Sequence, residues 1–262
     1  MFAPRLAVAT APFELPLRQA ISLAGELGVS GVQFEVRTEI KPDEMGETAR
    51  KQFLHYLSER SLSLGTLVVP LNRPLYEREK LDLRMEKVRG GLVLASQLRV
   101  RTLIFRAGRI PDNDTPDRTR LEELLADLAM FGNHLGVVPT ITPSDDSAET
   151  LLELTGKISS GPVGIDFDPA GFAINRRKPE EALHRLHGVV QHLQIRDGRS
   201  DVDGSGQETV VGQGQVRWEE ILALAAEMNY QGWMTIRRTG GEDRLADCVR
   251  AVKLMKSLAR LP

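Results

Sequence analysis

Cysteine, net charge and long apolar runs are all scarce in this chain of 262 residues. The single cysteine, Cys248, can form neither an intramolecular disulfide nor a cysteine-based zinc site, which favours a reducing, cytoplasmic setting. The 34 lysines and arginines nearly balance the 36 aspartates and glutamates, so a net charge of −2 gives no overall basic field for nucleic acid or an anionic membrane. No stretch approaches the roughly 18 uncharged apolar residues of a transmembrane helix, and the proline-interrupted N-terminus is not typical of a signal peptide. We therefore expect a cytoplasmic protein with no nucleic-acid or membrane partner.

The chain has the composition of a globular protein, with 41% hydrophobic and 27% charged residues. Eight short runs rich in β-branched residues alternate with longer segments in which apolar residues recur every three or four positions. Eight strand and helix pairs in about 250 residues are typical of a (β/α)8 TIM barrel. No linker rich in Pro, Gly or Ser divides the chain, so we predict one α/β domain, a single TIM barrel over residues 1–262. A doubly wound open sheet is the alternative, but the segment Ala7–Pro12 lacks the glycines of a phosphate-binding turn.

The predicted strands cover residues 6–10, 31–36, 64–69, 102–105, 137–142, 163–168, 189–196 and 233–237. The predicted helices cover residues 17–28, 47–60, 84–99, 118–136, 148–159, 178–188, 216–229 and 244–261.

Strand side chains alternate between the barrel lumen and the helix layer, so the apolar positions fix which residues face inward. Leu193, Ile195, Met234 and Ile236 are expected to pack against helices. The alternation then predicts an unusually polar lumen, because barrel interiors are normally filled by branched apolar side chains. The residues predicted to face inward are Gln33, Glu35, Thr140, Thr142, Asp166, Asp168, His192, Gln194, Arg196, Thr235 and Arg237, with Arg106 at the end of the fourth strand.

The polar residues at the strand ends are Arg106, Thr142, Asp168, Arg196 and Arg237. TIM-barrel enzymes build their sites at this carboxyl face, so these residues are candidates for ligand binding. The alternative is an ion-pair network that neutralises itself. Of the five histidines only His192 is expected to reach the lumen, and it lies four residues before the end of its strand.

Five segments, in their order and spacing, resemble one family. GELGVSGVQFEV resembles the second strand unit of that family, and LVLASQLRVRTLIFRAG resembles the fourth. VGIDFDPAGF resembles the sixth strand with its aspartate, and QHLQIRD resembles the seventh-strand pattern His-x-His-x-Lys-Asp. VGQGQVRWEEILALAAEMNYQGWMTIR resembles the glycine-rich loop, the following helix and the final strand. Over nearly its whole length the chain is similar to the xylose isomerase-like barrels, the sugar phosphate isomerase/epimerase group that also includes endonuclease IV.

The resemblance implies a divalent metal such as Mn, Mg or Zn, held by a glutamate, an aspartate, a histidine and a glutamate from strands five to eight. In epimerases of this pattern the two glutamates also move the proton beside the carbonyl, while the metal stabilises the enediolate. Three of the four positions differ here, because Thr142, Gln194 and Arg237 stand where the first glutamate, the histidine and the second glutamate are expected. Asp168 alone is retained, and no neighbouring Glu or His could replace the lost ligands.

One carboxylate among neutral oxygens would leave a divalent cation mostly to water. A guanidinium beside it would add repulsion of about 4 kcal/mol per unit charge at about 4 Å and an effective dielectric near 20. We therefore expect no metal cofactor. Arg237 is predicted to serve as a fixed cation in its place and to pair with Asp168 or Glu35.

Three functions follow as alternatives. The first is a catalytically inactive relative that binds a small polar or anionic carbohydrate through Arg106, Arg196 and Arg237 without metal. The second is a metal-free isomerase or epimerase of sugars or sugar phosphates, with Asp168 or Glu35 as the base and an arginine polarising the carbonyl. The third is a scaffold that binds no small molecule. Endonuclease activity is disfavoured, because its multi-zinc site needs more ligands than this barrel offers. Thr142, His192 and Gln194 complete the candidate ligand-binding residues.

The segment Asp197–Trp218, with Gly204, Gly206, Gly212 and Gly214, leaves a strand at the functional face. We expect a long mobile loop, with a lid and a surface excursion as its two alternatives. The sequence indicates neither a particular ligand nor an oligomeric state.

Overall fold

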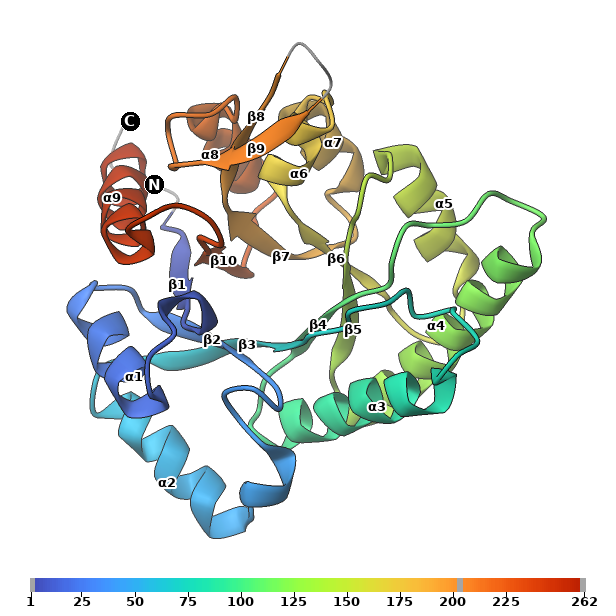
Figure 1. The fold of residues 1–262 in the computed structure, drawn as a ribbon, viewed down its shortest axis with the longest axis horizontal. Helices are drawn as coiled ribbons and strands as arrows, with labels where there is room; N and C mark the ends of the chain where they lie inside the picture. The colour runs from blue at the N-terminus through green and yellow to red at the C-terminus, as the bar shows by residue number, and fades with distance from the viewer. Residues whose placement is uncertain (1–2, 202–204, 260–262) are drawn as a thin grey trace.

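Eight parallel strands close into a barrel in this computed structural model, which describes residues 3–201 and 205–259 (Figure 1). They are β1 (Arg5–Ala9), β2 (Gly31–Glu35), β3 (Ser63–Val69), β4 (Thr102–Arg106), β5 (Val138–Thr142), β6 (Gly164–Phe167), β7 (Val190–Ile195) and β10 (Trp233–Ile236). Around the barrel their order is β1, β10, β7, β6, β5, β4, β3 and β2, and β2 pairs with β1 to close it. Every predicted strand is present, with both ends within one residue of the expected bounds. The predicted TIM barrel is confirmed.

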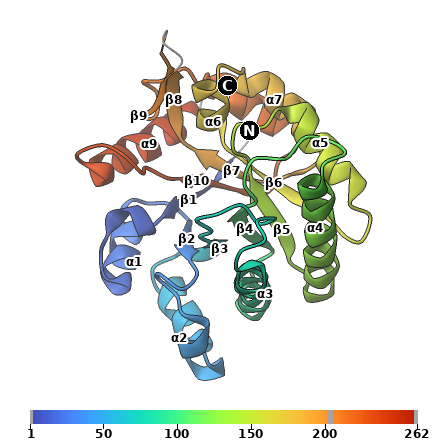
Figure 2. The ribbon, with the colours of Figure 1, turned by 45° about the vertical axis from the view of Figure 1, so that its right-hand side comes forward.

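Helices form the outer layer around the barrel (Figure 2). A typical example is α4, where the Thr115 side chain caps the first turn by accepting from the Arg118 backbone N–H, and Gly136 ends the helix with φ +69°. The short helix α6 (Pro169–Ile174) directly after β6 is not predicted from the sequence. The others match the predicted segments: α1 (Leu17–Glu26), α2 (Glu47–Ser58), α3 (Leu81–Gln97), α4 (Pro116–Leu135), α5 (Ala148–Lys157), α7 (Pro179–Leu186), α8 (Trp218–Glu227) and α9 (Arg244–Leu258).

The predicted register of the last strands is confirmed. Leu193, Ile195, Met234 and Ile236 are buried in the hydrophobic core together with apolar residues of the helices. The alternate side chains face the lumen, where polar groups bond across strands. Gln33 Nε2, for example, donates to Thr66 Oγ1 at 2.8 Å. The lumen is therefore polar, as the alternation predicts.

Trp233 fills the amino end of the barrel. Its indole lies against Gly31 and Gly65, where a Cβ atom would come within 2.4 Å and 3.0 Å of the ring. The Arg5 guanidinium lies 4.1 Å from the ring centroid, in a cation–π contact. The ring is thus confined on several sides, and Gly31 is required because only a residue without Cβ leaves room for it.

The segment predicted to be a mobile loop instead contains an antiparallel hairpin, β8 (Asp197–Ser200) and β9 (Gly206–Thr209). The Asp197 carboxylate accepts from the backbone N–H groups of Gly198 and Gly212, each at 2.8 Å, and of Gly214 and Val216 at 3.3 Å and 3.2 Å. It also accepts from the Trp218 indole N–H at 3.3 Å. The buried Asp197 carboxylate thereby holds the connection to α8 in place. Gly204, in the segment predicted as a loop, lies outside the described residues.

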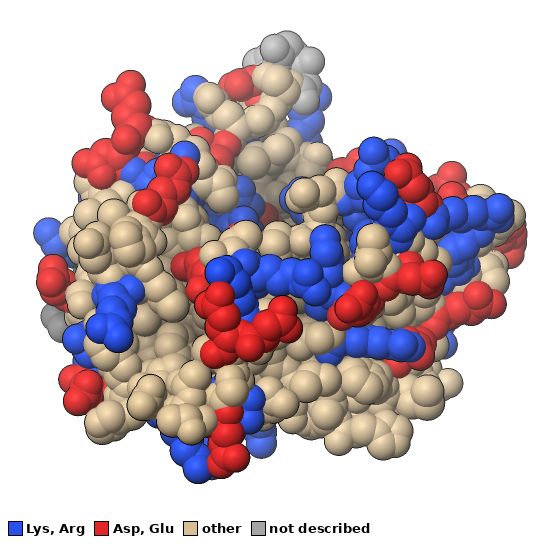
Figure 3. Space-filling view, turned by 60° about the horizontal axis from the view of Figure 1, so that its bottom comes forward, with Lys and Arg blue, Asp and Glu red and all other residues tan. Residues whose placement is uncertain are grey.

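Basic and acidic side chains are interspersed on the face of the molecule drawn in Figure 3. This mixture matches the near balance of charge in the sequence, a net −2. Within the described residues, no helix is both long and apolar enough to cross a membrane.

Candidate functional site

A polar cavity of about 330 Å³ opens at the carboxyl end of the barrel. It gathers six of the eight residues that the sequence analysis proposes for the site: Glu35, Arg106, Thr142, Gln194, Arg196 and Arg237. Val68, Val69, Pro70, Leu71, Phe105 and Thr239 complete the described lining. The two other proposed residues, Asp168 and His192, are not among the described residues that line it. A larger groove of about 650 Å³ lies between Lys41–Asp43 and α3 and shares no lining residue with this cavity.

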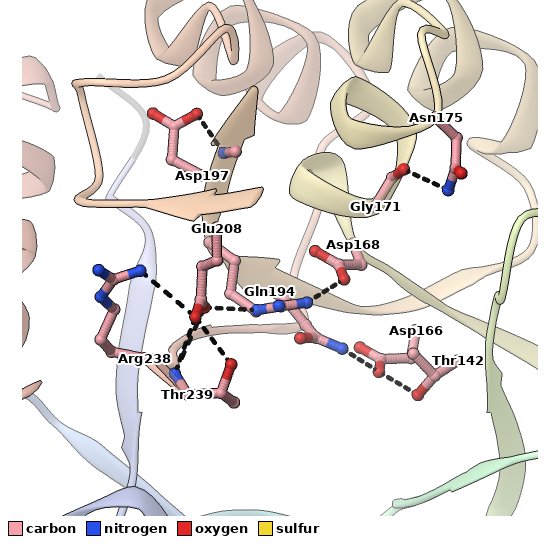
Figure 4. A network of polar contacts seen from close by, with 12 residues as sticks. Thr142, Asp166, Asp168, Gly171, Asn175, Gln194, Asp197, Glu208, Arg238 and Thr239 are labelled. Carbon is pink, nitrogen blue, oxygen red and sulfur yellow. Dashed lines mark hydrogen bonds and ion pairs between the residues drawn. The ribbon is translucent and has the colours of Figure 1, made fainter. Parts of the chain in front are cut away.

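Beneath the cavity, the buried Asp166 carboxylate joins three strands (Figure 4). Its Oδ2 accepts from Thr142 Oγ1 at 2.6 Å and from Gln194 Nε2 at 2.5 Å. Its Oδ1 accepts from His192 Nδ1 at 2.6 Å. Burial alone would raise the pKa of Asp166, but His192 and these hydrogen bonds hold that pKa below its usual range. The lumen thus holds the Asp166 carboxylate, whose oxygens act only as hydrogen-bond acceptors.

His192 lies one layer below the cavity and is fully buried. Its Nδ1 carries a proton because it bonds to a carboxylate that can only accept. Its Nε2 lies 2.7 Å from Thr235 Oγ1, so both ring nitrogens have partners. The ring therefore bridges Asp166 and Thr235 across the lumen, and contact between His192 and a ligand stays a prediction.

The predicted ion pair between Arg237 and Asp168 is wrong. The Asp168 carboxylate instead accepts from Arg196 Nη1, which comes from the end of β7. The strand order explains the difference, because β7 lies between β6 and β10 and separates Asp168 from Arg237. Arg237 forms no ion pair with Glu35 or with any other described residue, so its predicted alternative partner is also wrong.

Glu208 reaches the site from β9, and its carboxylate accepts hydrogen bonds from three residues (Figure 4). The donors to its carboxylate are Arg196 Nε at 3.0 Å, Thr239 Oγ1 at 2.7 Å, and the backbone N–H groups of Thr239 and Gly240 at 3.1 Å and 2.8 Å. Arg238 Nη1 adds an ion pair at 3.3 Å. Burial alone would raise the pKa of Glu208, but Arg196 and the hydrogen-bond donors lower it. Glu208 thus fastens the hairpin to the barrel mouth.

Sequence reasoning misses Glu208 because the hairpin carries no apolar alternation that would place it. Asp166 could have been found, since strand parity already directs it into the lumen beside Asp168.

The guanidinium groups of Arg106 and Arg237 line the cavity and have no side-chain partner in the described part of the chain. Neither takes part in an ion pair or side-chain hydrogen bond there. Among the described residues, the Glu35 carboxylate accepts only from the Thr38 hydroxyl, at 3.1 Å. Its backbone N–H donates to Glu39 Oε2 at 2.8 Å, and burial raises the pKa of Glu39. The cavity therefore combines two uncompensated cations with one carboxylate that has no ion-pair partner.

These residues do not fit a divalent cation at the positions implied by the sequence resemblance. Thr142 and Gln194 direct their donors to Asp166, and Asp168 is bonded to Arg196. Arg237 contributes a positive charge at the fourth position. In the described part of the chain, no group of three or more His, Cys, Asp or Glu residues could hold a metal ion. A hard divalent cation prefers several carboxylate or imidazole ligands, which this donor set does not offer.

A closed (β/α)8 barrel with a polar cavity at the carboxyl ends of its strands defines a TIM-barrel protein, with a candidate ligand site at the face where TIM-barrel enzymes build theirs. The family model described as xylose isomerase-like TIM barrel matches residues 21–258, so the chain belongs to that family. The resemblance inferred from the sequence is confirmed.

Individual relatives match this chain at low sequence identity. The chain is 26% identical over 160 residues to the rhizopine catabolism protein MocC of Rhizobium meliloti, a match covering 55% of this chain and 47% of the relative. The chain thus spans about half the length of the curated relatives it matches. A xylose isomerase domain protein from Planctomyces limnophilus superposes with a TM-score of 0.86 at 22% identity, covering 97% of both chains. L-Ribulose 3-epimerase superposes with a TM-score of 0.79 at 13% identity, covering 98% of this chain and 95% of that one. At these identities the two structures support the fold alone.

Proposed function

We propose that this barrel binds a small anionic carbohydrate, a sugar acid or a sugar phosphate, in the mouth cavity and without a divalent metal. The observation that carries the proposal is the pair of unpartnered guanidinium groups, Arg106 and Arg237, on one cavity. Planar guanidinium matches carboxylate and phosphate in geometry and charge, and charge-assisted bonds of this kind are strong. Arg196 contributes less, because Asp168 and Glu208 already neutralise it.

The size and lining of the cavity support a small polar ligand. A volume of about 330 Å³ lies at the lower end of the range for ligand pockets. Its cationic walls favour an anion over a neutral sugar. A carbohydrate is favoured by the membership of the sugar isomerase and epimerase family.

Isothermal titration calorimetry in EDTA tests the proposal with D-gluconate, D-glucose 6-phosphate and D-glucose as probes. We expect saturable binding of at least one anionic probe, and at least tenfold weaker binding of glucose. Arg106→Met and Arg237→Met should each weaken the anion by tenfold or more, since a charge-assisted bond contributes about 1.5–3 kcal/mol.

The matched control is Arg101→Met, because Arg101 is an exposed arginine just before the opposite end of the same strand, β4. It should leave binding unchanged. Saturable binding that both cavity variants leave intact would refute the proposal, and the absence of binding to every probe would favour the scaffold function.

Metal-free isomerase or epimerase activity is the second candidate, and one observation favours it: Glu35 lines the same cavity as the two arginines. A carboxylate without an ion-pair partner can accept the proton from the carbon beside a carbonyl, while a guanidinium stabilises the enediolate oxygen. Asp168 is the weaker candidate base, because it is bonded to Arg196 and lies outside the described cavity lining.

Exchange of that carbon-bound proton with solvent tests this second function. Aldose, ketose and sugar phosphate probes are incubated in D2O with EDTA and followed by proton NMR. An active enzyme would exchange the proton, and Glu35→Gln would lose exchange while keeping affinity for the anion. Exchange at an unchanged rate in Glu35→Gln would exclude Glu35 as the base.

A further inference from the structure

The side-chain amide of Gln194 has only one orientation that satisfies its surroundings. Its Nε2 donates to Asp166 Oδ2 at 2.5 Å, a bond that its oxygen could not replace because both atoms would then be acceptors. The amide oxygen is consequently turned away from Asp166 (Figure 4). Gln194 is 4% exposed, and this buried Oε1 has no hydrogen-bond partner among the described residues.

Thr142 is oriented by the same carboxylate. Its hydroxyl hydrogen points to Asp166 Oδ2, at an oxygen–oxygen distance of 2.6 Å. Only the lone pairs of Thr142 Oγ1 are then left for another partner. Both Thr142 and Gln194 line the cavity, so Gln194 Oε1 and Thr142 Oγ1 are acceptors for a ligand there, and the second hydrogen of Gln194 Nε2 is the one donor that these two side chains keep.

We propose that Asp166 is a positioning residue that makes the cavity floor an acceptor surface, and that the site therefore selects a polyhydroxylated anion. Ligand hydroxyls donate to Gln194 Oε1 and Thr142 Oγ1, while the carboxylate or phosphate of the same ligand meets Arg106 and Arg237. A buried acceptor without a partner costs about 1–3 kcal/mol, which a ligand hydroxyl relieves. An ammonium ligand could also donate to the floor, but the two unpartnered guanidinium groups repel it. This inference rests on the proposed function and assigns the residues that recognise the hydroxyl groups of its ligand.

The test compares D-gluconate with hexanoate, which has the same six-carbon chain and carboxylate but no hydroxyl groups beyond it. In calorimetry with EDTA, gluconate should bind the unmodified protein at least tenfold more tightly. Gln194→Met and Thr142→Val should each weaken gluconate by about tenfold, the value of one hydrogen bond, and leave hexanoate unchanged. The matched control is Thr140→Val on the same strand, because Thr140 is buried below the floor and bonds to the Val138 carbonyl.

A second measurement needs no ligand. In the nitrogen–proton NMR spectrum, the Gln194 side-chain NH2, assigned by its loss in Gln194→Met, should exchange slowly with solvent. Asp166→Asn should shift this signal and speed its exchange in protein that remains folded, whereas Thr140→Val should not.

The outcomes separate the two proposals. A protected Gln194 amide with equal binding of gluconate and hexanoate would overturn this inference and leave anion binding standing. A Gln194 amide that exchanges freely would overturn the orientation on which the inference depends. Failure of gluconate, hexanoate and D-glucose 6-phosphate alike to bind would overturn the proposed function, and the ligand class with it.

Discussion

Arg196 is the residue whose loss should most damage the carboxyl end of the barrel. It is the only described cation bonded to Asp168, and it also donates to Glu208. All three side chains are largely buried, with exposed fractions of 15%, 8% and 11% for Arg196, Asp168 and Glu208. Arg196→Met would therefore leave Asp168 with no counter-ion and Glu208 with Arg238 alone.

Removing one member of a buried pair costs about 3–5 kcal/mol, because the partner charge stays buried. We expect Arg196→Met to lower the free energy of unfolding by this amount, measured by equilibrium unfolding in urea. With an unfolding entropy of about 2.1 cal/mol/K per residue, the loss corresponds to a fall in Tm of roughly 5–9 °C.

A double-mutant cycle distinguishes the observed pair from the one expected from the sequence. Arg196→Met combined with Asp168→Asn should be less damaging than the sum of the single changes, with a coupling of about 1–3 kcal/mol. Arg237→Met combined with Asp168→Asn should be additive within about 0.5 kcal/mol. Additivity for Arg196 together with coupling for Arg237 would refute the network described here.

Four further predictions concern other parts of the chain. The pKa of Glu208 is lowered in the folded state, so the Glu208 carboxylate should stabilise the fold fully above its unfolded pKa of about 4.3. This contribution should be lost as the pH falls below that value, and Glu208→Gln should reduce the acid sensitivity of the unfolding free energy measured in urea. Gly31→Ala should cost about 1–3 kcal/mol by forcing Trp233 aside, whereas Gly188→Ala, which has open space around it, should stay within about 0.5 kcal/mol in the same unfolding assay. Burial, reinforced by Asp247, raises the pKa of Cys248 to about 12, so Ellman's reagent at pH 8 should label it only in unfolded protein. Purified protein exposed to excess manganese, zinc or magnesium should retain far less than one equivalent by elemental analysis, and one equivalent lost in Asp168→Ala would contradict this.

The count of eight strand and helix pairs predicted the barrel, and the alternation of side chains along each strand predicted the inward residues. The outward apolar positions, such as Leu193 and Met234, fix the phase of each strand, and a slip of one residue would expose them. The face at which each strand ends, and the strands that flank each inward residue, then follow from the topology of the barrel. For this reason six of the eight proposed site residues do line one cavity.

Pairing within the site was predicted wrongly, because the expected pair was taken from the metal position that the resemblance implies and not from the strand order. The sequence places Asp168 and Arg237, which carry opposite charges, at the ends of two strands. Which residues form the ion pair depends on which strands are neighbours. Arg196 lies on the strand adjacent to Asp168, and the shorter distance decides the pair. Glu208 joins the network through a hairpin whose position depends on Asp197, a tertiary contact that leaves no periodic signal in the sequence.

The residues at the positions where the sequence resemblance implies metal ligands form a consistent set. Thr142 and Gln194 each donate a hydrogen bond to Asp166, and these bonds help to keep this deeper carboxylate charged. Asp168, at the position of the implied aspartate, forms an ion pair with Arg196. Both carboxylates therefore have partners, whereas Arg237 lies at the cavity with no ion-pair partner among the described residues. A buried network that compensates its own charges, beside a cation that stays uncompensated, is what the proposed anion site requires.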